Sequence, residues 1–240
     1  MGEAKLIHFP DDEALARAAA REWVSSANSA AQEGRKYLVA LSGGRITKKL
    51  FAQVVELAAS QAGSLSNVEF FWADERCLPP DDPESNYRLA NELLFLPLGI
   101  HSGRVHRIRG EFPPENGAKQ ATEELLRVAG ADSTVPVLDL VLLGMGEDGH
   151  IASLFPGDTA TQNDVDSIFL SVNNSPKPPS DRVSLGHGPI AAAKEVWVLA
   201  TGAAKQAALQ ESLSPTGKTP LASVIQKRPI TRIFSDIPLG

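Results

Sequence analysis

Short runs of apolar residues alternate along this chain with segments in which apolar positions recur every three or four residues. The runs are continuous rather than alternating with polar residues, which is typical of parallel strands covered on both faces. They predict six strands, of which the fourth and the last are the weakest: 37–41, 68–72, 138–143, 167–172, 195–200 and 231–234.

The segments between these runs have helical spacing. Asp11–Ser29 begins with acidic residues, which suit the positive end of a helix, and its apolar positions recur at intervals of four. Further helices are predicted at 47–62, 85–94, 114–128 and 203–213. This alternation predicts an α/β sandwich with a mostly parallel sheet. The proline-rich stretch Asn173–Ser180 is short, so we expect one domain over residues 1–240 with a functional loop at that point.

Composition excludes several classes of function. The chain has 240 residues, 42% of them hydrophobic and 22% charged, which is ordinary for a globular protein. The formal charge of −6 and the lack of a basic block argue against a nucleic-acid partner. No apolar stretch reaches the ~18 residues that a membrane span needs. A single cysteine, Cys77, excludes an intrachain disulfide, and the scattered histidines form no metal pattern, so we expect a cytoplasmic protein without a metal.

Ligands of such sheets collect where the strands end, so residues directly after each strand carry the candidate chemistry. Ser42-Gly43-Gly44-Arg45 follows the first predicted strand. Paired glycines let a ligand approach the backbone closely, and a helix beginning here favours an anion. A plain tight turn explains the same residues equally well.

Asp74-Glu75-Arg76 follows the second strand. The two carboxylates could accept hydrogen bonds from hydroxyl groups, and Arg76 could bind an anion or polarise a carbonyl. From spacing alone, a solvated acidic turn with a surface arginine is slightly favoured. Ser85, at the start of the next helix, is best explained as its N-cap.

The segment after the third strand is the most informative. Gly144, Gly146 and Gly149 form a literal G-x-G-x-x-G, but Pro156-Gly157 stops the long helix that a dinucleotide site requires. What remains is a tightly turned loop that ends in His150, with Asp148 two residues before it. A neutral imidazole is a natural general base near pH 7, and Asp148 could fix its tautomer. The alternative is an ordinary capping histidine.

A fourth segment combines prolines with two cations. The prolines of 176–179 stiffen the loop, and Lys177 and Arg182 could together clamp a phosphate. The alternative is a surface loop with two solvated charges.

These segments together resemble the 6-phosphogluconolactonases and, more distantly, the glucosamine-6-phosphate deaminases. The resemblance rests on Ser-Gly-Gly at 42–44, Asp-Glu-Arg at 74–76, Ser-Asn-Tyr at 85–87, the segment 143–157, and Lys-Pro-Pro with Arg182. It implies a modified Rossmann-like, three-layer α/β/α fold and hydrolysis of 6-phosphoglucono-δ-lactone without a cofactor. It also implies that His150 is the catalytic base and that residues 42–44, Arg76, Lys177 and Arg182 lie near the substrate.

Two features bear on this resemblance. The family usually reads Ser-Gly-Gly-Ser-Thr-Pro, whereas here Arg45-Ile46-Thr47 follows the glycines, so Arg45 could bind the phosphate or crowd it. The deaminases need a carboxylate shortly after the histidine loop, and Ser153-Leu154-Phe155-Pro156 has none. We expect the substrate to be a phosphosugar lactone, with Asp148, Arg76 and Asp74 also in the site, and a monomer or weak homodimer. A deaminase or a non-catalytic sugar-phosphate sensor is the alternative.

Overall fold

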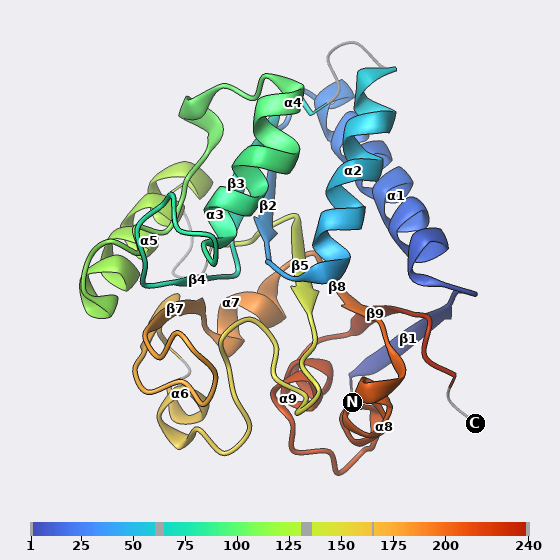
Figure 1. Ribbon diagram of the computed structural model, residues 1–240, viewed down its shortest axis with the longest axis vertical. Coiled ribbons are helices and arrows are strands. Elements are labelled where there is room, and N and C mark those ends of the chain that lie inside the picture. The colour runs from blue at the N-terminus through green and yellow to red at the C-terminus, as the bar shows by residue number, and fades with distance from the viewer. Residues whose placement is uncertain (1, 61–64, 131–135, 165, 239–240) are drawn as a thin grey trace.

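A six-stranded parallel sheet runs through the centre of the molecule (Figure 1). The computed structural model describes residues 2–60, 65–130, 136–164 and 166–238. The strand order is β1-β9-β8-β5-β2-β3, and each neighbouring pair is parallel. The strands are β1 (Glu3–His8), β2 (Tyr37–Leu41), β3 (Val68–Trp72), β5 (Leu140–Gly144), β8 (Glu195–Ala200) and β9 (Ile230–Ser235).

Helices cover both faces of this sheet, so the predicted three-layer α/β/α architecture is confirmed. On one face α1 packs against α2, while α7, α8 and α9 lie on the other. The main helices are α1 (Asp12–Gln32), α2 (Arg45–Ala59), α5 (Pro114–Ala129), α7 (His187–Ala192), α8 (Gln206–Leu213) and α9 (Pro220–Lys227). The shorter ones are α3 (Asn86–Ala90), a π-helical turn (Asn91–Phe95), α4 (Leu96–Leu98), α6 (Thr159–Asn163) and 3₁₀ turns at Ser102–Arg104 and Ala203–Lys205.

The sequence pattern explains how α1 begins and which face it buries. Asp11 caps the helix by accepting a hydrogen bond from the backbone N–H of Ala14 at 2.7 Å. Leu15, Ala19 and Trp23, spaced four apart, are fully buried against the sheet layer.

The bounds of α2 differ slightly from the predicted range 47–62. The helix begins two residues earlier, at Arg45, and residues 61–62 lie outside the described residues.

A second, three-stranded antiparallel sheet lies beside the first, in the order β4-β7-β6. It contains β4 (Asp74–Arg76), β6 (Phe169–Val172) and β7 (Arg182–Leu185). The expectation that 167–172 belongs to the parallel sheet is therefore wrong. The proline-containing segment 173–181 turns the chain back on itself, so β6 and β7 pair as a hairpin instead of being joined by a crossover helix.

The order of the parallel strands determines where a ligand can bind. β8, β5, β2 and β3 are consecutive neighbours, so their carboxyl ends meet along one edge of the sheet. Open α/β sheets bind ligands in the crevice at such an edge.

Within the described residues, no helix has the length and hydropathy to cross a membrane, and no three His, Cys, Asp or Glu side chains are grouped to hold a metal.

Candidate active site

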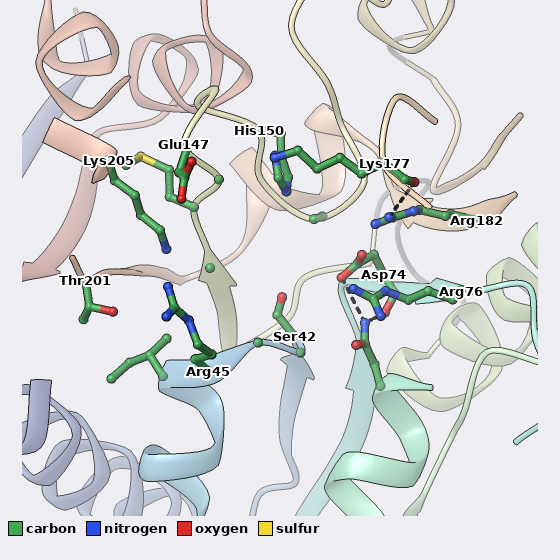
Figure 2. Close-up of a pocket in the computed structure, with 18 residues that line it drawn as sticks. Ser42, Arg45, Asp74, Arg76, Glu147, His150, Lys177, Arg182, Thr201 and Lys205 are labelled. Atoms are coloured by element: carbon green, nitrogen blue, oxygen red, sulfur yellow. Dashed lines mark hydrogen bonds between the residues drawn. The ribbon is translucent and has the colours of Figure 1, made fainter. Parts of the chain in front are cut away.

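A cavity of about 370 Å³ opens at the carboxyl ends of these four strands (Figure 2). Segments far apart in the sequence contribute to its wall, because each strand delivers the residues that follow it to the same edge. Nine of the residues predicted from the sequence line it: Ser42, Gly43, Gly44, Arg45, Asp74, Arg76, His150, Lys177 and Arg182. Asp148 lies directly behind His150, to which it is hydrogen-bonded.

His150 and Asp148 form an imidazole–carboxylate pair. Nδ1 of His150 lies 2.5 Å from Oδ1 of Asp148, which makes Nδ1 the protonated nitrogen because an ionised carboxylate can only accept. Nε2 is then the basic nitrogen. The loop can hold this pair only because residue 146 is glycine: a Cβ there would lie 2.0 Å from His150 Nδ1 and 2.5 Å from Asp148 Oδ1.

The surroundings of the pair set its protonation. Burial lowers the pKa of His150 below its usual value, while the hydrogen bond and charge of Asp148 act in the opposite direction. For Asp148, burial acts to raise the pKa, but the contacts with His150 and Lys177 outweigh it and leave the pKa lowered. Near neutral pH the pair is therefore a neutral imidazole held by a carboxylate, which is the form that accepts a proton.

Lys177 reaches this pair from the loop between β6 and β7. Its Nζ lies 3.3 Å from Asp148 Oδ2 and 3.4 Å from His150 Nδ1. The positive charge of Lys177 contributes to lowering the pKa of His150, because it disfavours a second cation beside it. Lys177 thus keeps Asp148 ionised and His150 neutral.

Arg182 holds that loop in place. It is 4% exposed, and its guanidinium donates three hydrogen bonds, of 3.0–3.1 Å, to the consecutive carbonyls of residues 177–179. Its Nη1 lies 3.4 Å from the hydroxyl of Ser153, which in turn donates to Asp74 Oδ2 at 2.7 Å. Most donors of Arg182 are therefore occupied by protein acceptors.

Glu75 organises the wall opposite the histidine loop. This buried carboxylate accepts hydrogen bonds of 2.7–2.8 Å from the backbone N–H groups of Arg76, Asn86 and Tyr87, and one of 3.0 Å from the Ser85 hydroxyl. Burial raises its pKa, and these donors oppose the shift. A solvated acidic turn, slightly favoured from spacing, is therefore the wrong interpretation, because the fold surrounds the carboxylate with donors.

The N-cap expected at Ser85 is confirmed, since its hydroxyl accepts a hydrogen bond from the backbone N–H of Arg88 at 3.2 Å. It places Asn86 in the first turn of α3, and Asn86 Nδ2 donates to the Asp74 carbonyl at 2.9 Å. The amide also fills the space beside the early turn: a Cβ at position 43 would lie 2.0 Å from Asn86 Oδ1. Only glycine fits there.

The far end of the cavity has a different character. Arg45, the first residue of α2, and Lys205, after β8, both line it, and their charged ends point toward one another (Figure 2). Burial lowers the pKa of Lys205, and the nearby charge of Arg45 adds to this effect. Neither side chain has a hydrogen bond or an ion pair with any of the residues that the structure describes.

Four polar or charged side chains of the cavity were not predicted as site residues: Asn86, Glu147, Thr201 and Lys205. For Thr201 the sequence contains a signal. Thr201 directly follows the strand Glu195–Ala200, so the search of strand ends that found Ser42 and Asp74 also applies to it. Lys205 lies four residues further, at the end of a 3₁₀ turn that only the structure reveals.

An α/β sandwich with an imidazole–carboxylate pair in a strand-end cavity, together with two cations that have no partner among the described residues, is typical of enzymes that act on small anionic molecules. Residues 10–233 match the family described as glucosamine-6-phosphate isomerases/6-phosphogluconolactonase, and the chain belongs to this family.

Individual relatives agree with this assignment. A 6-phosphogluconolactonase of Streptomyces coelicolor is 34% identical over 221 residues, which cover 89% of this chain and 84% of that protein. A 6-phosphogluconolactonase of Haemophilus influenzae is 35% identical over 203 residues, which cover 82% of this chain and 84% of that protein. The solved structure of the Trypanosoma brucei 6-phosphogluconolactonase has a TM-score of 0.84 and 26% identity, over 98% of this chain and 97% of that one.

Proposed function

We propose that this protein hydrolyses 6-phospho-D-glucono-1,5-lactone to 6-phosphogluconate. Family membership and relatives that carry the name 6-phosphogluconolactonase support the reaction. The observation that carries the proposal is the position of His150, hydrogen-bonded to Asp148, on the wall of a cavity whose other end holds two cations without a partner in the described part of the chain. Such a cavity offers a base for water and a counter-charge for a phosphate.

The proposed reaction begins with a water molecule at Nε2 of His150. His150 takes one proton as the water oxygen attacks C1, the carbonyl carbon of the lactone. The tetrahedral intermediate then expels the ring oxygen, the bond from C1 to that oxygen breaks, and His150 returns the proton to the new hydroxyl. Asp148 stabilises the imidazolium formed in between. General base catalysis of this kind contributes about 10²–10⁴-fold.

The intermediate carries a negative charge on the former carbonyl oxygen. Arg76 and the backbone amides of the 144–149 loop are the candidates to stabilise it, because Arg76 and residues 144–147 of that loop line the cavity. Donors placed for an oxyanion contribute about 10²–10³-fold each. The reaction consumes only water, so it needs no cofactor.

The phosphate is best accommodated at the Lys205 end, beside the turn at 42–44. There the N-terminus of α2 has no acidic residue in its first turn and no side-chain cap, so its backbone N–H groups are available to an anion. The alternative clamp by Lys177 and Arg182 is less suited, since Arg182 donates to loop carbonyls and Lys177 contacts Asp148.

The cytoplasmic location and the monomeric or weakly dimeric state expected from the sequence stay predictions.

A coupled assay with purified protein tests the function. The lactone also hydrolyses by itself, so the rate in buffer alone is subtracted. We expect a rate far above that blank and no ammonia release from glucosamine 6-phosphate. Ammonia release would support the deaminase alternative. Binding of 6-phosphogluconate without accelerated ring opening would support a non-catalytic sensor.

A further inference from the structure

Arg45 and Lys205 stand apart from the other cations of the cavity. Lys177, Arg76 and Arg182 each have protein acceptors within 3.5 Å. Arg45 and Lys205 have no such acceptor among the residues of the described ranges, although both side chains project into the cavity (Figure 2). One end of the cavity therefore carries two positive charges that no described residue pairs with.

Two like charges held close together repel each other, and the repulsion is stronger where water is partly excluded. Glu147 and Asp236 are the acidic groups near enough to act on Lys205, and neither forms an ion pair with it or with Arg45 in the described residues. A phosphomonoester dianion supplies two negative charges and several acceptor oxygens. The guanidinium of Arg45 can hold two of these oxygens at once, a geometry that lysine or serine cannot reproduce.

We propose that Arg45 is a specificity-determining residue, which closes on the phosphate from the side opposite Lys205 and makes the site selective for a doubly charged phosphorylated lactone. This proposal rests on the proposed function, because it concerns the same substrate. It assigns to Arg45 a direct contact with the phosphate. Because Arg45 is exposed, its long side chain has the freedom to swing over a ligand that has entered.

The test compares Arg45→Ser with Lys48→Ser. Lys48 is an exposed cation three residues further along α2, and it does not line the cavity, so it matches the change in charge and helix but not the contact. For the phosphorylated lactone we expect Arg45→Ser to raise KM about tenfold with little change in kcat, which is the low end for a charged hydrogen bond. Lys48→Ser is expected to behave as the unmodified protein.

Selectivity provides a second readout. The ratio of kcat/KM for the phosphorylated lactone to that for glucono-δ-lactone is expected to fall about tenfold in Arg45→Ser, and Arg45→Lys should restore only part of it. An unchanged or lower KM in Arg45→Ser, or the same loss in Lys48→Ser, would overturn the proposal.

A binding measurement separates this inference from the proposed function. The affinity for 6-phosphogluconate, measured by calorimetry, depends on the phosphate contact and requires no turnover. If the unmodified protein fails to open the lactone, the proposed function fails. A loss of 6-phosphogluconate affinity in Arg45→Ser alone would then still support the contact, and equal affinity in both variants would refute it.

Discussion

The two ends of the cavity contain the same kinds of charged side chain in opposite situations. Around His150, Lys177 pairs with Asp148, and Arg182 donates to three consecutive carbonyls. At the other end, Arg45 and Lys205 have no partner in the described part of the chain. Arg182 holds the loop in place and Lys177 adjusts the pKa of its neighbours, whereas Arg45 and Lys205 are available to a ligand. The comparison assigns chemistry to one end and binding to the other.

The largest expected effect is at the chemical end. His150→Gln removes the proposed base but keeps a polar side chain of similar size, so we expect kcat to fall about 10²–10⁴-fold while KM changes little. Steady-state kinetics on the lactone measure both. His8→Gln is the matched control, because His8 is exposed on β1, far along the sheet from β5. Turnover close to normal in His150→Gln would remove this residue from the mechanism.

The next effect belongs to the binding end. Lys205→Met keeps most of the chain length and removes the charge, so KM should rise about 10–100-fold, as expected for a hydrogen bond to a charged group. The kcat value should change far less. A fall in kcat as large as the rise in KM would show that the two ends do not divide the work as inferred.

The smallest expected effect tests the role of Lys177, which contacts Asp148. In the proposed mechanism activity requires neutral His150. It should therefore rise with pH through the pKa of this group, which burial lowers and which Asp148, Lys177 and Asp74 adjust. Lys177→Met removes a positive charge beside the imidazole and therefore raises its pKa. The acidic limb of the kcat/KM profile should move to higher pH. A limb that stays in place, or moves to lower pH, contradicts this role for Lys177.

The parallel sheet could be predicted because its central strands are buried on both faces, which leaves continuous apolar runs such as Tyr37–Leu41. β1 was missed because it is an edge strand with mostly exposed or half-buried residues. β4 was missed because it has three residues, all charged, and pairs only through contacts with β7. Neither strand has a local hydrophobic signal.

Some of the site could likewise be predicted from the sequence, and some could not. The histidine loop and the Ser-Gly-Gly turn were predicted because chemistry and backbone geometry restrict the residues there. The donors of Arg182 could not be assigned from sequence, because its acceptors are backbone carbonyls, which every residue has. The burial of Glu75 likewise depends on α3 folding over it.

The pairing of β1 with β9 has a consequence for how the molecule assembles. All six residues of β1 are in register with β9, and β1 lies at the edge of the sheet, so β9 is its only neighbouring strand among the described residues. Contacts between such distant segments form late, because a long loop must close first. We therefore expect β1 to stay unpaired during synthesis until β9 has been made. Loss of β9 would leave both β1 and β8 with open hydrogen-bonding edges, which invite association between chains.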